Sequence, residues 1–174
     1  MKRGEKSGQV WIETVIYTLI ALTMIGAVLV FITPKIKETQ DRAVIEQTLN
    51  VLQNIDGVVA SMIQGGPGNK RIVNVGIKEG TLEINGANDT LTFELQTDKG
   101  FSEEGKTINI GGIDVLTKRV QNIYYVTLTK NYSNYDVKFE GKNEAKTLTQ
   151  GTTPYMITIE NKGGTKTVLD FTIN

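Results

Sequence analysis

Residues 8–36 read GQVWIETVIYTLIALTMIGAVLVFITPKI, and they contain the most apolar segment of the chain. From Thr14 to Pro34 it contains 21 consecutive residues without a charged side chain. A helix rises by about 1.5 Å per residue, so these residues would span roughly 30 Å, close to the hydrocarbon thickness of a bilayer. The stretch therefore predicts a helix long enough to cross a membrane.

The residues that flank this stretch predict its orientation. The preceding segment MKRGEKSG carries a net charge of +2, from Lys2, Arg3 and Lys6 against Glu5. Basic residues stay on the cytoplasmic side, so the rest of the chain is expected outside the cell. A cleaved secretory signal peptide is disfavoured, because Thr33-Pro34-Lys35 is not a small-residue cleavage site. A simple membrane anchor that holds an external domain remains an alternative.

Glu13 is the unusual residue of the apolar segment. A carboxylate in a membrane-spanning helix costs about 2.5 to 3.5 kcal/mol at the centre and less near the interface. A plain anchor gains nothing from that cost. A positive group nearby would offset it, and a free amino terminus created by proteolysis is the obvious candidate.

Gly8-Gln9-Val10-Trp11-Ile12-Glu13 resembles the cleavage region of archaeal type IV pilins, which carry class III signal peptides. The resemblance implies that a prepilin peptidase removes residues 1–8 as a leader after Gly8. Gln9 would then be the first mature residue and Glu13 the fifth, where the family characteristically has Glu. Ser7 is a departure, because a charged residue commonly precedes the cleaved Gly. The resemblance covers about residues 1–60.

The resemblance also implies a function and partners. The chain would be a structural subunit of an extracellular filament that serves surface adhesion, with identical subunits as its partners. The prepilin peptidase, an assembly ATPase and a membrane platform would act on it, and the chain would stand in the cytoplasmic membrane before assembly. Glu13 would pair with the amine of Gln9 on an adjacent subunit. A secretion-system pseudopilin and an anchored binding domain that never polymerises are the alternatives.

Residues 9–65 are predicted to form a long helix, hydrophobic over 10–34 and amphipathic over 35–65. Beyond Pro34 the apolar residues recur at steps of three and four, as in Ile45, Leu49 and Leu52. Pro34 lacks an N–H, so a kink is expected there. Two separate helices are the alternative. Gly65-Gly66-Pro67-Gly68 is a strong helix stop.

Residues 66–174 alternate between apolar and polar side chains, which predicts an antiparallel β-rich head and an α+β fold. Eight alternating sets recur at intervals of roughly ten residues. Asn85-Gly86, Gly111-Gly112 and Asn161 to Gly164 are the predicted turns, and the last of them closes a terminal hairpin.

Composition excludes several kinds of chemistry. The chain has no Cys and no His, which excludes thiolate and imidazole catalysis or ligation. Lys and Arg total 19 and Asp and Glu total 19, so net charge gives no argument for nucleic acid. No serine lies in a recognisable nucleophile motif. We therefore expect no enzyme activity, no catalytic residue, no cofactor and no metal site.

Two sequons mark candidate glycosylation sites. Asn88-Asp89-Thr90 and Asn131-Tyr132-Ser133 both fall at or near predicted turns in the part expected outside the cell. Four tyrosines also cluster within twelve residues, at positions 124, 125, 132 and 135. Packing in the sheet core is the favoured interpretation of this cluster, and an adhesive aromatic patch is the alternative.

Overall fold

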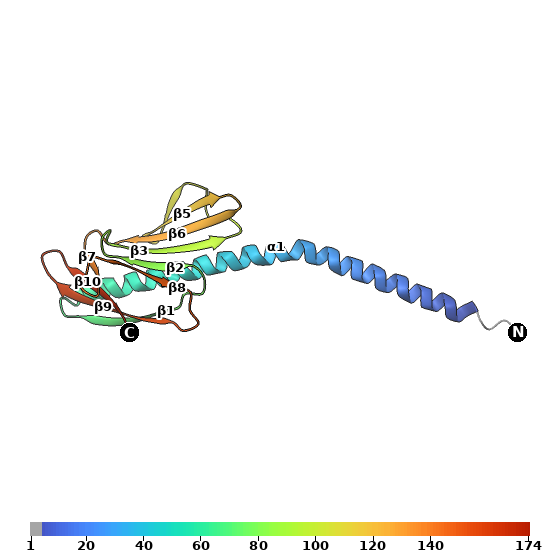
Figure 1. Cartoon of the computed structure of the whole chain (residues 1–174), viewed down its shortest axis with the longest axis horizontal. Helices are drawn as coiled ribbons and strands as arrows, with labels where there is room; N and C mark the ends of the chain where they lie inside the picture. The colour runs from blue at the N-terminus through green and yellow to red at the C-terminus, as the bar shows by residue number, and fades with distance from the viewer. Residues whose placement is uncertain (1–4) are drawn as a thin grey trace. The chain divides into compact units, whose positions relative to one another are not determined.

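A computed structural model describes residues 5–174 and, within the helix, the side chains from Val10 onward. Residues 1–4 of the predicted leader lie outside the described residues. The helix α1 (Glu5–Gln64) has 60 residues and contains Pro34 without interruption, so the alternative of two separate helices is wrong. The kink expected at Pro34 stays a prediction. Figure 1 draws α1 from blue to green and the strands of the head from green to red.

The chain divides into two compact units after Gln40. The first unit consists of α1 up to Gln40. The second unit, called the head below, comprises Asp41–Asn174 and therefore contains the amphipathic part of α1 together with all the strands.

The amphipathic part of α1 packs one stripe into the core of the head. Ile45, Leu52, Ile55, Val59 and Met62 recur at helical spacing, and each is at most 2% exposed. The helix ends at Gln64, immediately before the predicted stop. The N–H groups of the two glycines that follow donate to carbonyls in the last turn of the helix, which closes it.

The strands form two sheets, which confirms an α+β fold with an antiparallel-rich β region. The four-stranded sheet has the order β1-β9-β10-β7, and the six-stranded sheet has the order β4-β5-β6-β3-β2-β8. Every pairing between these strands is antiparallel except that of β10 with β7. The strands are β1 (Lys70–Val75), β2 (Thr81–Asn85), β3 (Thr90–Thr97), β4 (Thr107–Ile110), β5 (Ile113–Val120), β6 (Ile123–Asn131), β7 (Asp136–Phe139), β8 (Ala145–Thr149), β9 (Tyr155–Gly163) and β10 (Val168–Ile173).

All eight predicted alternating sets fall on strands, except that Ile77 of the first set lies beyond the end of β1, and their alternation separates core from surface. On β3, for example, Leu91, Phe93 and Leu95 are buried, whereas Thr92 is half-buried and Glu94 exposed. The inner faces of both sheets and the buried stripe of α1 share one hydrophobic core. The structure adds β5 and β8, which the sequence analysis did not identify.

The predicted turns are confirmed at two of three places. Gly111 and Gly112 join β4 to β5 with φ values of 61° and 82°, which glycine adopts without steric cost. Residues 86–89 join β2 to β3. The predicted terminal hairpin is confirmed, because β9 and β10 are antiparallel neighbours, but its turn was placed three residues too early: β9 extends to Gly163 and the turn comprises residues 164–167. Asn161 lies in the strand, where its side-chain Nδ2 donates to the Gly66 carbonyl at 3.2 Å.

Candidate functional site

The amino-terminal part of α1 is the largest exposed apolar surface among the described residues. Between Val10 and Ile36 every large hydrophobic side chain is 45–77% exposed. These residues surround the helix on all sides, a pattern typical of a helix that another apolar medium or another chain covers. By length and composition, this helix could span a membrane.

The threonine hydroxyls in this segment are satisfied within the helix itself. The hydroxyls of Thr14, Thr18, Thr23 and Thr33 donate to the carbonyls four residues earlier, at 2.7–2.9 Å. A hydroxyl bonded in this way carries no unmet hydrogen bond into an apolar environment. The four threonines are therefore compatible with lipid or with a helix bundle.

Glu13 is the only charged residue between Val10 and Pro34, and its side chain is exposed on the described helix. Gly8 and Gln9, which flank the predicted cleavage point, lie on the backbone of α1 about one turn earlier. Their side chains lie outside the described residues. Cleavage after Gly8 and the pairing of Glu13 with Gln9 stay predictions.

The two predicted sequons lie side by side. Asn88 is exposed in the β2–β3 turn, and Asn131 is exposed at the end of β6. The Tyr132 N–H donates to the Asp89 carbonyl at 2.8 Å, which joins the two segments. The Oδ1 atom of Asn131 accepts the Ser133 N–H at 2.7 Å. Both acceptor asparagines therefore lie at one end of the six-stranded sheet, and their glycosylation stays a prediction.

The four clustered tyrosines differ in burial. Tyr132 is 3% exposed and belongs to the core, whereas Tyr124, Tyr125 and Tyr135 are half-buried. The rings of Tyr132 and Tyr135 have their centroids 6.3 Å apart. Packing therefore accounts for Tyr132, while the other three rings leave part of their surface accessible.

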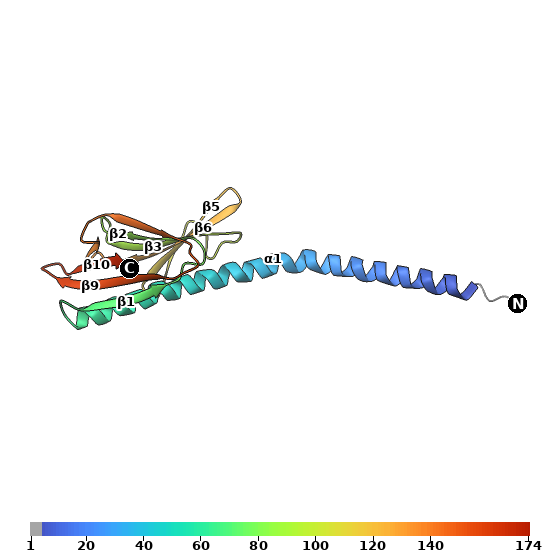
Figure 2. The same ribbon diagram turned by 60° about the horizontal axis from the view of Figure 1, so that its bottom comes forward.

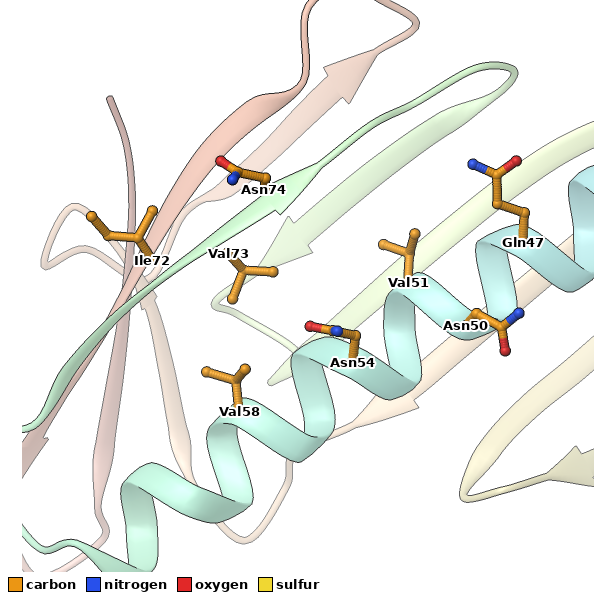
Figure 3. Close-up of a pocket in the computed structure, with 8 residues that line it drawn as sticks. All are labelled: Gln47, Asn50, Val51, Asn54, Val58, Ile72, Val73 and Asn74. Atoms are coloured by element: carbon orange, nitrogen blue, oxygen red, sulfur yellow. The ribbon is translucent and has the colours of Figure 1, made fainter.

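A groove that the sequence analysis did not identify separates α1 from β1 (Figure 3). Its volume is about 370 Å³. β1 pairs only with β9, so its other edge carries no strand partner among the described residues. The lining is amide and aliphatic, from Gln47, Asn50, Val51, Asn54 and Val58 on the helix and Ile72, Val73 and Asn74 on the strand. The helix and the unpaired edge of β1 therefore form the two walls of the groove.

Charged groups in the head form structural pairs. Lys162 contacts the buried Asp170 carboxylate at 2.5 Å, and this hydrogen bond raises the pKa of the lysine. Lys130 contacts Asp56 at 2.8 Å and so ties β6 to α1. Burial, and then the negative charge of Asp56, raise the pKa of Tyr132. Across the described residues, no three acidic side chains gather in a group that could hold a metal ion.

Comparison of the chain with protein-family models, curated proteins and solved structures returns no match. The case for a function therefore rests on the chain's own surfaces.

Proposed function

We propose that this chain is a structural subunit of an extracellular filament similar to an archaeal type IV pilus. A prepilin peptidase would cut it after Gly8, and the mature subunits would polymerise through the apolar part of α1. Before assembly the chain would stand in the cytoplasmic membrane, with its head outside the cell. The observation that carries this proposal is the apolar helix between Val10 and Ile36, which is exposed on all sides and has one carboxylate near its start.

Physical chemistry supports polymerisation of such a helix. Apolar surface gains roughly 25 cal/mol for each Å² removed from water, so a helix that is apolar on all sides cannot leave lipid unless other subunits cover it. A bundle of identical helices provides that cover. In such a bundle an unpaired carboxylate would be heavily penalised, whereas one paired with an amine would fix the register of neighbouring helices.

We further propose that the filament serves surface adhesion. The half-buried rings of Tyr124, Tyr125 and Tyr135 would offer aromatic contact area on the outside of such a filament. The two alternatives keep the same helix but change its use. An anchored binding domain would never leave the membrane, and a pseudopilin would be cleaved but form only short assemblies.

Identification of the amino-terminal residue, in protein purified from the native cell surface, tests the proposal. A start at Gln9 is expected, together with filaments visible by electron microscopy. Gly8→Val is expected to block processing, and Gly4→Val serves as the matched control that leaves it intact. A chain that starts at Met1 in both the wild type and Gly8→Val would overturn the proposal. Processed protein without filaments would favour the pseudopilin.

A further inference from the structure

The turn between β5 and β6 presents apolar side chains to solvent. Within Asp41–Asn174, the exposed large hydrophobic side chains are Ile72, Val120, Ile123 and Met156. Val120 and Ile123 flank the two-residue turn Gln121-Asn122 and are register partners, 55% and 43% exposed. Two apolar side chains therefore meet at the tip of one hairpin.

Basic and aromatic residues lie directly behind this tip. Lys118 and Tyr125 are register partners two residues from Val120 and Ile123, so all four lie on the same face of the hairpin. On the opposite face, the guanidinium of Arg119 lies 5.4 Å from the centroid of the Tyr124 ring. Lys118 and Arg119 are the only charged residues from position 117 to position 125. The hairpin end thus combines two apolar residues, two tyrosines and a net charge of +2.

The turn is also held in an unusual conformation. Gln121 adopts a φ of 57°, a region that favours glycine. Arg119 supports the turn, because its Nε donates to the Gln121 carbonyl at 3.0 Å. This arrangement fixes Val120 and Ile123 at the tip instead of leaving them on a loose loop.

The hairpin tip lies at the end of the head where α1 enters it. Tyr124 pairs with Thr97, and the N–H of the neighbouring Asp98 donates to the Asp41 carboxylate at 3.0 Å. Phe101 follows Asp98 in the same loop, and the guanidinium of Arg42 on α1 lies 5.8 Å from the centroid of its ring. Figures 1 and 2 both show the β5–β6 turn at this end of the head. Only the four residues 37–40 separate Ile36, the last residue of the apolar surface, from Asp41.

We propose that the β5–β6 tip docks on the outer surface of the membrane while the subunit awaits assembly, and that its partner is a bilayer with anionic headgroups. This inference rests on the proposed membrane stage of the chain. Apolar residues at a tip, with tyrosines and cations just behind them, match the layers of a bilayer interface, from acyl chains to headgroups. The short connection to the membrane segment keeps the tip at high local concentration near the lipid.

The test uses the full chain in lipid vesicles. Because the chain has no cysteine, Asn122→Cys provides a single position for an environment-sensitive fluorophore. Asn88→Cys, in the β2–β3 turn at the opposite end of the six-stranded sheet, is the matched control. Trp11 is the only tryptophan and reports independently whether the apolar segment has entered the bilayer. Spin-labelled lipids quench whichever probe contacts the membrane.

Three outcomes separate the possibilities. Docking predicts quenching at position 122 but not at position 88 in vesicles that contain phosphatidylglycerol. Lys118→Gln is expected to lower the docked-to-undocked ratio about fivefold, and replacement of Val120 and Ile123 by Ser to abolish the quenching. Quenched Trp11 with an unquenched label at position 122 would overturn docking while leaving the membrane segment intact. Unquenched Trp11 would overturn both docking and the membrane stage of the proposed function.

Discussion

Glu13 is the residue on which the choice between a subunit and a plain anchor depends. If its carboxylate pairs with the amine of Gln9 in a neighbouring subunit, Glu13→Gln removes the charge but keeps the shape and polarity of the side chain. Insertion is expected to stay intact, because an uncharged Gln crosses the interface at lower cost than a carboxylate. Assembly is expected to fail, because the amine would lose its partner in a low-dielectric bundle.

Membrane fractionation and counts of filaments by electron microscopy measure the two effects separately. Glu46→Gln is the matched control, since Glu46 forms only an exposed pair with Arg42 at 3.3 Å. Filaments of normal number and length from Glu13→Gln would contradict the assigned role of the carboxylate.

Tyr132 supplies a second test at the scale of one residue. Its hydroxyl is buried without a hydrogen-bond partner among the described residues, and its ring lies beside Lys130, whose ammonium is 5.7 Å from the ring centroid. A buried donor without a partner is costly, so Tyr132→Phe is expected to raise the free energy of unfolding by about 1 kcal/mol. Tyr155→Phe is the control and is expected to lower the free energy of unfolding, because the Tyr155 hydroxyl donates to the Thr149 carbonyl at 3.0 Å and the variant loses this bond. Urea denaturation followed by circular dichroism measures both changes.

The same residue gives the head a dependence on alkaline pH. The folded state raises the pKa of Tyr132 above the unfolded value of 10.0, and that of Lys162 above 10.5. A group whose pKa is higher when folded stabilises the fold fully below its unfolded pKa and loses that contribution as the pH rises. The free energy of unfolding is therefore expected to fall above about pH 10, and less steeply in Tyr132→Phe. An equal slope in both proteins would contradict the role given to Tyr132.

At the scale of elements, the sequence predicts what a regular pattern encodes. The long helix and eight strands follow from periodicity, because each places apolar residues on one face. β8 was not predicted from the sequence, because Leu148 is its one buried residue and so no alternation is visible. β5 was not predicted either, because its alternation of apolar and polar residues is irregular. Leu116 directly follows Val115, and the polar residue Thr117 occupies a buried position. The Gly111-Gly112 turn was a usable signal, since a two-residue hairpin turn requires a strand on each side.

Of the candidate functional surfaces, some could be predicted from the sequence and others could not. Exposure of the apolar helix was predictable, because no equally apolar partner segment exists elsewhere in the sequence. The groove beside β1 was not predictable, because it depends on which strand ends at the edge of a sheet. The hairpin tip was hidden as well, since Val120 and Ile123 look like strand residues until the register places them at a turn.

The two halves of α1 are expected to respond differently to the same substitution. Leu52 is 1% exposed in the core of the head, so Leu52→Ala should lower the free energy of unfolding of the head by about 2 to 5 kcal/mol. Leu22 is 62% exposed, and Leu22→Ala should leave that free energy unchanged. Denaturant unfolding in mild detergent, followed by the tyrosine signals of the head, measures the difference. Equal destabilisation by both variants would show that the apolar half also stabilises the head.

At the scale of the whole molecule, the division after Gln40 implies that folding and assembly depend on different parts of the chain. The head carries its own core, which includes the buried stripe of α1 from Ile45 to Met62. A chain shortened to begin at Lys37 keeps every one of these core residues. It is therefore expected to fold, with the hydrogen-exchange protection of the strands retained. It lacks the apolar surface and is expected neither to enter membranes nor to form filaments.

Sedimentation and electron microscopy of the shortened chain, beside the full chain under the same conditions, measure this separation. A folded monomer is the expected result, because burial of the apolar helix supplies the proposed driving force for assembly. Contacts between heads would then only add specificity to a polymer that the helices hold together. Filaments formed by the shortened chain would place the driving force in the heads, with the free edge of β1 beside its groove as the first surface to mutate.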